Sequence, residues 1–180
     1  MEIIQTPIAG LLIIKPRIFS DDRGYFYESW NREAFTKNGI TTDFVQDNQS
    51  LSQKGVLRGL HFQNPPHAQA KLVRVIQGAV LDVAVDIRKS SPTYGQHVAV
   101  EINEENKLMF LIPEGFAHGF LTLQNNTIFS YKCSAYYSKV SEGCLLWNDP
   151  DLAIGWNTAA PTLSGKDLEG NTFRSFSSLF

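Results

Sequence analysis

Two histidines are the side chains in this sequence best suited to exchange protons with a bound molecule. His61 lies in Arg58-Gly59-Leu60-His61-Phe62-Gln63, and His118 lies in Gly115-Phe116-Ala117-His118-Gly119. Both fall near the ends of expected β-strands, and histidine titrates close to neutral pH. A lone histidine in a strand is more often a packing residue, so neither one establishes a site alone.

Strand alternation around His61 predicts which neighbours share its face. With a period of two, His61 shares one face with Leu57, Gly59 and Gln63, while Arg58 lies on the opposite face. A glycine beside the histidine would leave room for a bound molecule over the imidazole. Arg58 either reaches a ligand through a local bend or forms an ion pair outside, and the sequence does not decide between these.

A metal site of the cupin type is the main rival interpretation of these histidines. It would need a closely spaced His-x-His pair, but Gln63 occupies the second position. His61, His118 and a carboxylate could still form a facial triad. We nevertheless predict that the protein binds no metal.

The elements that must position these residues are mostly strands. Alternating apolar residues favour strands over 72–76, 79–87, 98–102, 107–112, 119–123 and 127–134, with polar turns between them. Gln77-Gly78 indicates a hairpin between the first two. Short strands at this spacing predict an antiparallel sandwich or barrel. One short helix is expected over 31–39, and residues 1–180 are expected to form a single domain.

Composition excludes several classes of protein. The 180 residues carry 16 basic and 18 acidic side chains, a net charge of −2, which argues against binding nucleic acid. No apolar run approaches the length of a membrane span. On these two grounds, neither a nucleic acid nor a membrane is expected as a partner. Cys133 and Cys144 are too few for a disulfide framework, and we expect a cytoplasmic protein.

Seven short segments, in order along the chain, resemble one enzyme family. They are Arg23-Gly24-Tyr25-Phe26-Tyr27-Glu28, Gln46-Asp47-Asn48-Gln49-Ser50, Gly55-Val56-Leu57-Arg58-Gly59-Leu60-His61-Phe62-Gln63, Lys71-Leu72-Val73-Arg74-Val75, Asp82-Val83-Ala84-Val85-Asp86-Ile87-Arg88, Ser91-Pro92-Thr93-Tyr94-Gly95 and Pro113-Glu114-Gly115-Phe116-Ala117-His118-Gly119-Phe120. Together they are similar to the dTDP-4-dehydrorhamnose 3,5-epimerases, which invert two carbons of a dTDP-linked 4-keto sugar.

The resemblance implies an all-β fold, a double-stranded β-helix or cupin jelly roll with a few short helices. It implies a homodimer, and catalysis with no cofactor. It also implies that the N-terminal strands cross to the other subunit, where Arg23, Phe26 and Glu28 would complete the site.

The resemblance further assigns roles in the reaction. A C4 ketone acidifies the C–H bonds at C3 and C5, so an epimerase needs a base on one face of the sugar and an acid on the other. By resemblance the base is His61, oriented by Asp167, and the acid is Tyr131. Lys71, aided by His118 and Arg58, would stabilise the enolate oxygen or bind the diphosphate.

The remaining residues implied by the resemblance bind the dTDP-sugar. Tyr137 is similar to a residue that stacks on thymine, and further contacts are expected from Gln46, Asp47, Asn48, Glu142 and Lys166. Three alternatives stay open: a 3-only or 5-only epimerase, a ketoisomerase of a related 4-keto-6-deoxysugar, and a non-catalytic sugar-binding or metal-binding cupin.

Overall fold

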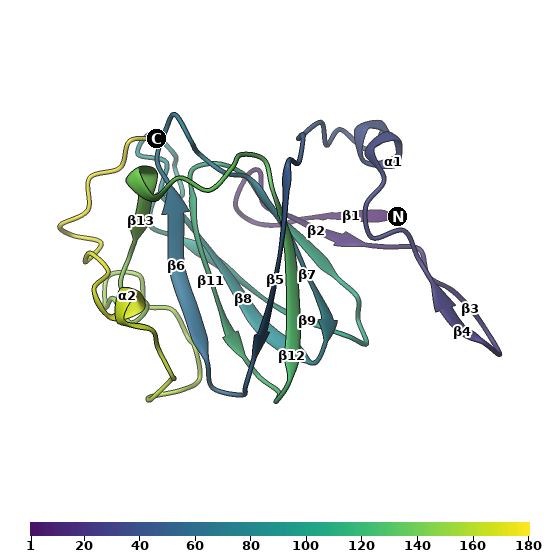
Figure 1. The fold of residues 1–180 in the computed structure, drawn as a ribbon. Helices are drawn as coiled ribbons and strands as arrows, with labels where there is room; N and C mark the ends of the chain where they lie inside the picture. Colours follow the sequence, from purple (N-terminus) through teal and green to yellow (C-terminus); the bar gives the residue numbers. More distant parts are fainter.

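Two antiparallel sheets face each other in the computed structural model, which describes residues 1–180 (Figure 1). The strands of the first sheet are β1 (Glu2–Gln5), β2 (Leu12–Lys15), β5 (Gln46–Ser52), β7 (Lys71–Gln77), β10 (Met109–Ile112) and β12 (Thr127–Cys133). The strands of the second sheet are β6 (Leu57–Gln63), β8 (Ala79–Asp86), β9 (His97–Asn103), β11 (Phe116–Thr122) and β13 (Glu142–Cys144). Their spatial orders are β1-β2-β10-β7-β12-β5 and β13-β6-β11-β8-β9. The all-β prediction is confirmed.

The elements outside the two sheets are short. A two-stranded ribbon, β3 (Phe19–Asp21) and β4 (Gly24–Phe26), extends away from the body (Figure 1). The helices are α1 (Arg32–Lys37), the single 3-10 turn η1 (Lys139–Ser141) and α2 (Gly165–Leu168). As predicted, Asn31 caps α1: its side chain accepts a hydrogen bond from the N–H of Ala34 at 3.1 Å.

The expected alternation of side chains holds along β8. Val80 and Ala84 point into the core between the sheets, whereas Val83 and Val85 point to the outer face of the second sheet. The core between the sheets also holds Phe110 from β10 and other large residues of both sheets. Both faces of β8 are therefore buried, which explains its continuous apolar sequence.

The C-terminal segment covers the outer face of the second sheet. Leu145, Leu152 and Trp156 are fully or nearly fully buried in a cluster with Leu57 and Leu60 of β6. Figure 1 shows the C-terminal part of the chain running alongside β6. This packing brings α2 beside β6, which matters for the site described below. The longest helix, α1, has six residues, and none of the helices could span a membrane.

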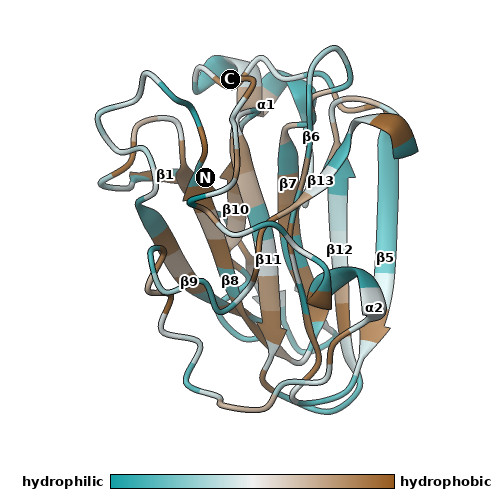
Figure 2. Ribbon diagram, turned by 90° about the vertical axis from the view of Figure 1, so that its left-hand side faces the viewer, coloured by the Kyte–Doolittle hydropathy of each residue, from teal (hydrophilic) through white to brown (hydrophobic).

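The edge strand β5 is polar, whereas β7 and β10 of the same sheet are largely apolar (Figure 2). Its residues alternate between exposed and partly buried positions, with Gln46, Asn48 and Ser50 on the partly buried side. A polar edge strand of this kind suits the wall of a ligand pocket better than the wall of a core.

Strand limits differ from prediction where backbone conformation intervenes. The strand expected from Lys107 begins at Met109, because Lys107 has a φ of 50°, which is left-handed rather than extended. The strand expected from Gly119 begins at Phe116, since the residues from 116 onward pair with β8.

Candidate active site

A pocket of about 430 Å³ opens between the two sheets and is lined by residues of both. This volume lies in the range of small-ligand sites. Of the residues expected to form the site, those that line it are Gln46, Asn48, Arg58, His61, Lys71, His118, Tyr131, Tyr137, Glu142, Lys166 and Asp167. Residues from six strands and from the tail thus converge on one cavity.

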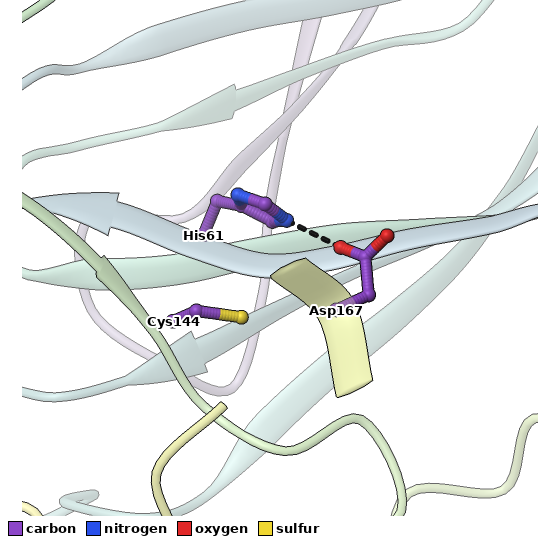
Figure 3. Close-up of side chains that lie close together, drawn as sticks. All are labelled: His61, Cys144 and Asp167. Atoms are coloured by element: carbon purple, nitrogen blue, oxygen red, sulfur yellow. Dashed lines mark hydrogen bonds and ion pairs between the residues drawn. The ribbon is translucent and has the colours of Figure 1, made fainter. Parts of the chain in front are cut away.

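The expected pair of His61 and Asp167 is formed on one wall of this pocket (Figure 3). The Nε2 atom of His61 lies 2.6 Å from Oδ1 of Asp167, whose side chain is only 4% exposed. Oδ1 also accepts the N–H of Gly59 at 3.1 Å. A carboxylate can only accept a hydrogen bond, so Asp167 favours the His61 tautomer that carries its proton on Nε2. Nδ1 of His61 is then the basic nitrogen.

A local motif holds Asp167 in position. Ser164 caps the start of α2 and forms a capping box with Asp167: the N–H of Ser164 donates to Oδ2 of Asp167 at 3.1 Å, and the N–H of Asp167 donates to the hydroxyl oxygen of Ser164 at 3.4 Å. The Ser164 hydroxyl in turn donates to Oδ2 at 2.6 Å. Burial would raise the pKa of Asp167, but the hydrogen bonds from His61, Ser164 and Gly59 outweigh it and hold that pKa far below its usual value. Asp167 is therefore ionised throughout the neutral range.

Tyr131 stands on the opposite side of the pocket from His61, since β12 and β6 belong to the two facing sheets. Burial raises the pKa of the Tyr131 hydroxyl, the neighbouring Cys133 raises it further, and Arg58 opposes both. The phenol consequently keeps its proton at neutral pH and can donate it.

A second histidine–aspartate pair joins His118, which lines the pocket, to Asp82. The Nε2 atom of His118 lies 3.0 Å from both carboxylate oxygens of Asp82, and both residues are buried. Burial lowers the pKa of His118, although the charge of Asp82 opposes this. Burial likewise lowers the pKa of Lys71, against the attraction of Cys133, Asp82 and Glu142. Asp82 was missed by sequence reasoning, although alternation places it on the inner face of β8.

The structure corrects the expected face pattern of β6. The pairing of β6 with β11 shifts register between His118 and Phe120, so the alternation breaks between Arg58 and His61. Arg58 and His61 both line the pocket, whereas Leu57 and Leu60 pack outside, under the C-terminal segment. The local bend is therefore the correct one of the two alternatives for Arg58, and the predicted strict alternation is wrong.

Gly59 serves a purpose other than the predicted one. A Cβ atom at Gly59 would lie 2.4 Å from Cα of Gly119, and its φ is +137°. The missing side chain therefore admits the backbone of β11, rather than a ligand over the imidazole.

Four expected site residues lie outside this pocket. Arg23 and Phe26 are on the exposed β3–β4 ribbon, where Arg23 pairs with Asp21, and Glu28 accepts a hydrogen bond from Asn31 at 2.8 Å. Asp47 occupies the outer face of β5, where Lys132 donates to it at 2.8 Å.

Amides that sequence reasoning did not assign to the site shape the rim of the pocket. Gln63, at the position where a cupin metal site would have a second histidine, accepts the N–H of Ser138 at 2.7 Å and donates to the carbonyl of His67 at 2.6 Å. Gln69 donates to the carbonyl of Ala135 at 2.7 Å. Both side chains therefore fix the loop that carries Tyr137. Ser164 was also missed, although Ser-x-x-Asp at 164–167 is a recognisable capping signal.

The potential metal ligands nearest one another are His61, Cys144 and Asp167, with ligand atoms within 4.8 Å, rather than the His61 and His118 set considered from sequence (Figure 3). Their chemistry does not favour a metal. Both oxygens of Asp167 already accept hydrogen bonds. Burial raises the pKa of Cys144 to about 12, aided by Asp167 and Glu142, so a metal would have to displace the thiol proton in order to bind there.

Fold and pocket together define a class, the cupin-fold proteins with a ligand pocket between the two sheets. The model of the dTDP-4-dehydrorhamnose 3,5-epimerase family matches residues 5–175. A Shigella flexneri dTDP-4-dehydrorhamnose 3,5-epimerase is 51% identical over 96% of both chains. The chain belongs to this family.

Solved structures agree with the sequence matches. A Legionella pneumophila dTDP-6-deoxy-D-glucose-3,5-epimerase in complex with dTDP-4-keto-L-rhamnose is 49% identical, with a TM-score of 0.94 over 98% of this chain and 94% of that one. A Streptomyces bikiniensis 3'-monoepimerase with dTDP bound is 33% identical, with a TM-score of 0.88 over 93% of this chain and 85% of that one. The expected cupin fold is confirmed.

Proposed function

We propose that this chain is a dTDP-4-dehydrorhamnose 3,5-epimerase, converting dTDP-4-dehydro-6-deoxy-D-glucose to dTDP-4-dehydro-L-rhamnose. The observation that carries the proposal is the placement of His61 and Tyr131 on the two facing sheets of one pocket. A sugar ring between them would present one face to a base and the other to an acid, which inversion of a carbon requires.

In the proposed reaction, Nδ1 of His61 takes the proton from C5 or C3. The electron pair of the broken C–H bond moves into the enolate, whose negative charge develops on the C4 oxygen. Lys71 and Arg58 supply positive charge in the same pocket. Tyr131 then donates its hydroxyl proton to the carbon from the opposite face, and the configuration is inverted.

Relatives support this choice of acid and base. The Streptomyces bikiniensis 3'-monoepimerase has been crystallised as a double mutant with a histidine changed to asparagine and a tyrosine to phenylalanine, at the same spacing as His61 and Tyr131. The higher identity to 3,5-epimerases, 51% against 33%, favours double over single inversion.

The test is incubation with dTDP-4-dehydro-6-deoxy-D-glucose in deuterated water, followed by NMR of the product. We expect inversion and deuterium at both C3 and C5. Deuterium at one carbon alone would reduce the function to single epimerisation, and a carbonyl moved to C3 would identify a ketoisomerase. His61→Asn should abolish turnover, and undiminished turnover would remove His61 as the base.

We also propose that two such single-domain chains form a homodimer by exchanging N-terminal ribbons. The ribbon exposes 51% of Phe19, 58% of Tyr25 and 66% of Phe26, an apolar surface that a second subunit would cover. Arg23, Phe26 and Glu28 would then reach the partner's pocket.

Mixing two inactive variants tests the exchange. Subunits carrying His61→Asn and Arg23→Ala, unfolded and refolded together, should regain about a quarter of the wild-type sites, because each mixed dimer rebuilds one complete pocket. If each ribbon served its own pocket, the mixture would stay as inactive as its components.

A further inference from the structure

Glu142 lies beside the candidate base in the pocket, and the side chains of both residues are partly exposed. It begins β13, which pairs with β6 so that Glu142 lies opposite Gln63 and Cys144 lies opposite His61. Its Oε1 atom is 3.9 Å from Nδ1 of His61, on the side of the ring away from Asp167. The imidazole therefore has a carboxylate near each of its two nitrogens.

The two oxygens of Glu142 differ in their partners. Oε2 accepts hydrogen bonds from Lys166 at 2.8 Å and from the hydroxyl of Tyr137 at 3.1 Å, and no protein group donates to Oε1. Lys166 is 60% exposed, whereas the side chain of Glu142 is only 23% exposed. Glu142 is thus anchored through one oxygen, with the other oxygen free to accept a proton from His61.

Double epimerisation requires the base to be used twice. After the first C–H bond breaks, Nδ1 of His61 carries the abstracted proton, while Tyr131 has lost its own. Before the second C–H bond can break, His61 must release that proton. Asp167 does not provide this exit, because it faces Nε2 and all its hydrogen-bonding capacity is directed to His61, Gly59 and Ser164.

We propose that Glu142 carries the abstracted proton from Nδ1 of His61 to water at the pocket mouth, which resets the base between the two inversions. The N–H bond at Nδ1 breaks as an O–H bond forms at Oε1, leaving neutral imidazole and a carboxylic acid. The acid then gives its proton to water. This role rests on the proposed function and makes Glu142 a positioning residue that acts through His61.

The charge state of Glu142 agrees with this role. Burial would raise the pKa of Glu142, but Lys166 and Tyr137 outweigh it and hold the pKa below its usual value. Glu142 is therefore an anion when His61 becomes a cation, and the attraction between them shortens the 3.9 Å separation. A carboxylic acid of low pKa also passes its proton to water readily.

The experiment compares two deuterium signals in Glu142→Gln. In deuterated water, product acquires deuterium from Tyr131, whereas recovered substrate acquires it only when His61 exchanges its proton with solvent before returning it. We expect the ratio of deuterium in recovered substrate to deuterium in product to fall by about tenfold or more. The singly inverted intermediate should also accumulate, because the second inversion cannot begin until His61 has lost the first proton.

Control variants distinguish a role of Glu142 in proton transfer from a role in substrate binding. Tyr137→Phe removes a hydrogen bond to Oε2 but keeps the carboxylate, so the ratio should change far less than in Glu142→Gln. In Glu142→Ala, added formate should restore the ratio by replacing the missing carboxylate, and this variant also serves if Glu142→Gln does not fold. The proposal would be overturned if Glu142→Gln had the same deuterium ratio as the wild type. It would also be overturned if formate did not raise the ratio in Glu142→Ala. Failure of the proposed function is distinct, because the wild type would then form no inverted product.

Discussion

The Nε2 atom of His61 lies 2.6 Å from Oδ1 of Asp167, although 106 positions separate the two residues along the chain. The contact joins a strand of the second sheet to the C-terminal segment that packs over the outer face of that sheet. Folding of the tail is therefore required to orient the candidate base, and changes in the tail should affect chemistry as well as stability.

Asp167→Asn tests this orientation directly. The Nδ2 amino group of asparagine could take the place of Oδ1 and donate to Nε2 of His61, so the variant no longer favours the tautomer with a free Nδ1. We expect kcat to fall by about 10²- to 10⁴-fold. Product formation followed by NMR measures the change, and Ser164→Ala is the matched control. That variant keeps the carboxylate but loses one hydrogen bond to Oδ2, so it should cost about 1 kcal/mol and retain most activity.

Tyr131→Phe should separate proton removal from proton delivery. The ring keeps its packing against Phe129, at 5.9 Å between ring centroids, but the donor is lost. We expect inversion to fall by about 10²- to 10⁴-fold. His61 should still exchange C3 or C5 protons, so deuterium enters recovered substrate without inversion. Inverted product formed at the wild-type rate would show that another group is the acid.

Gly59→Ala should destabilise the contact between β6 and β11. The added Cβ would lie 2.4 Å from the backbone of Gly119, which has no side chain that could move away. With the cost of a positive φ added, we expect the free energy of unfolding to fall by about 3 kcal/mol or more. Urea denaturation measures this. Gly155→Ala, where a Cβ meets nothing within 4 Å, should change it by less than about 0.5 kcal/mol.

Asp86 should make stability depend on acid pH. Its buried carboxylate accepts from Arg88, Ser91 and Thr93, and these bonds outweigh burial and lower its pKa to about 2. Since the unfolded value is near 4, Asp86 contributes fully above that pH and loses its contribution as pH falls toward 2. The contribution is about 2 kcal/mol.

Urea unfolding of wild type and Asp86→Asn at pH 7 and at pH 2.5 measures this dependence. The difference in unfolding free energy between the two proteins should shrink at the lower pH, because the wild-type carboxyl is then partly protonated. If the difference in unfolding free energy were the same at both pH values, the negative charge of Asp86 would not stabilise the folded protein.

The sequence by itself determined the strands and most of their faces. Alternation along β8 predicted which of its side chains share a face, because side chains of a strand necessarily point to opposite sides. That both faces are buried was decided by the packing of the two sheets and the C-terminal segment. The Asn31 cap followed from local backbone chemistry in the same way. The hairpin predicted at Gln77-Gly78 is wrong, because the turn at Gly78 carries the chain from β7 in one sheet to β8 in the other, and the two strands do not pair. The resemblance to a family assigned His61, Tyr131 and Asp167 to one site. Local periodicity could not have done so, because the three residues lie far apart in the sequence.

Only the tertiary structure decided which side chains meet. Arg58 joins His61 in the pocket because the pairing with β11 shifts register, and register is a property of two strands rather than of one sequence segment. Asp82 binds His118 and Glu142 faces His61 because separate strands pair side by side. Contacts between distant segments depend on packing the whole chain around one core, so the second His–Asp pair and the position of Glu142 beside the base emerge only once the sheets are assembled.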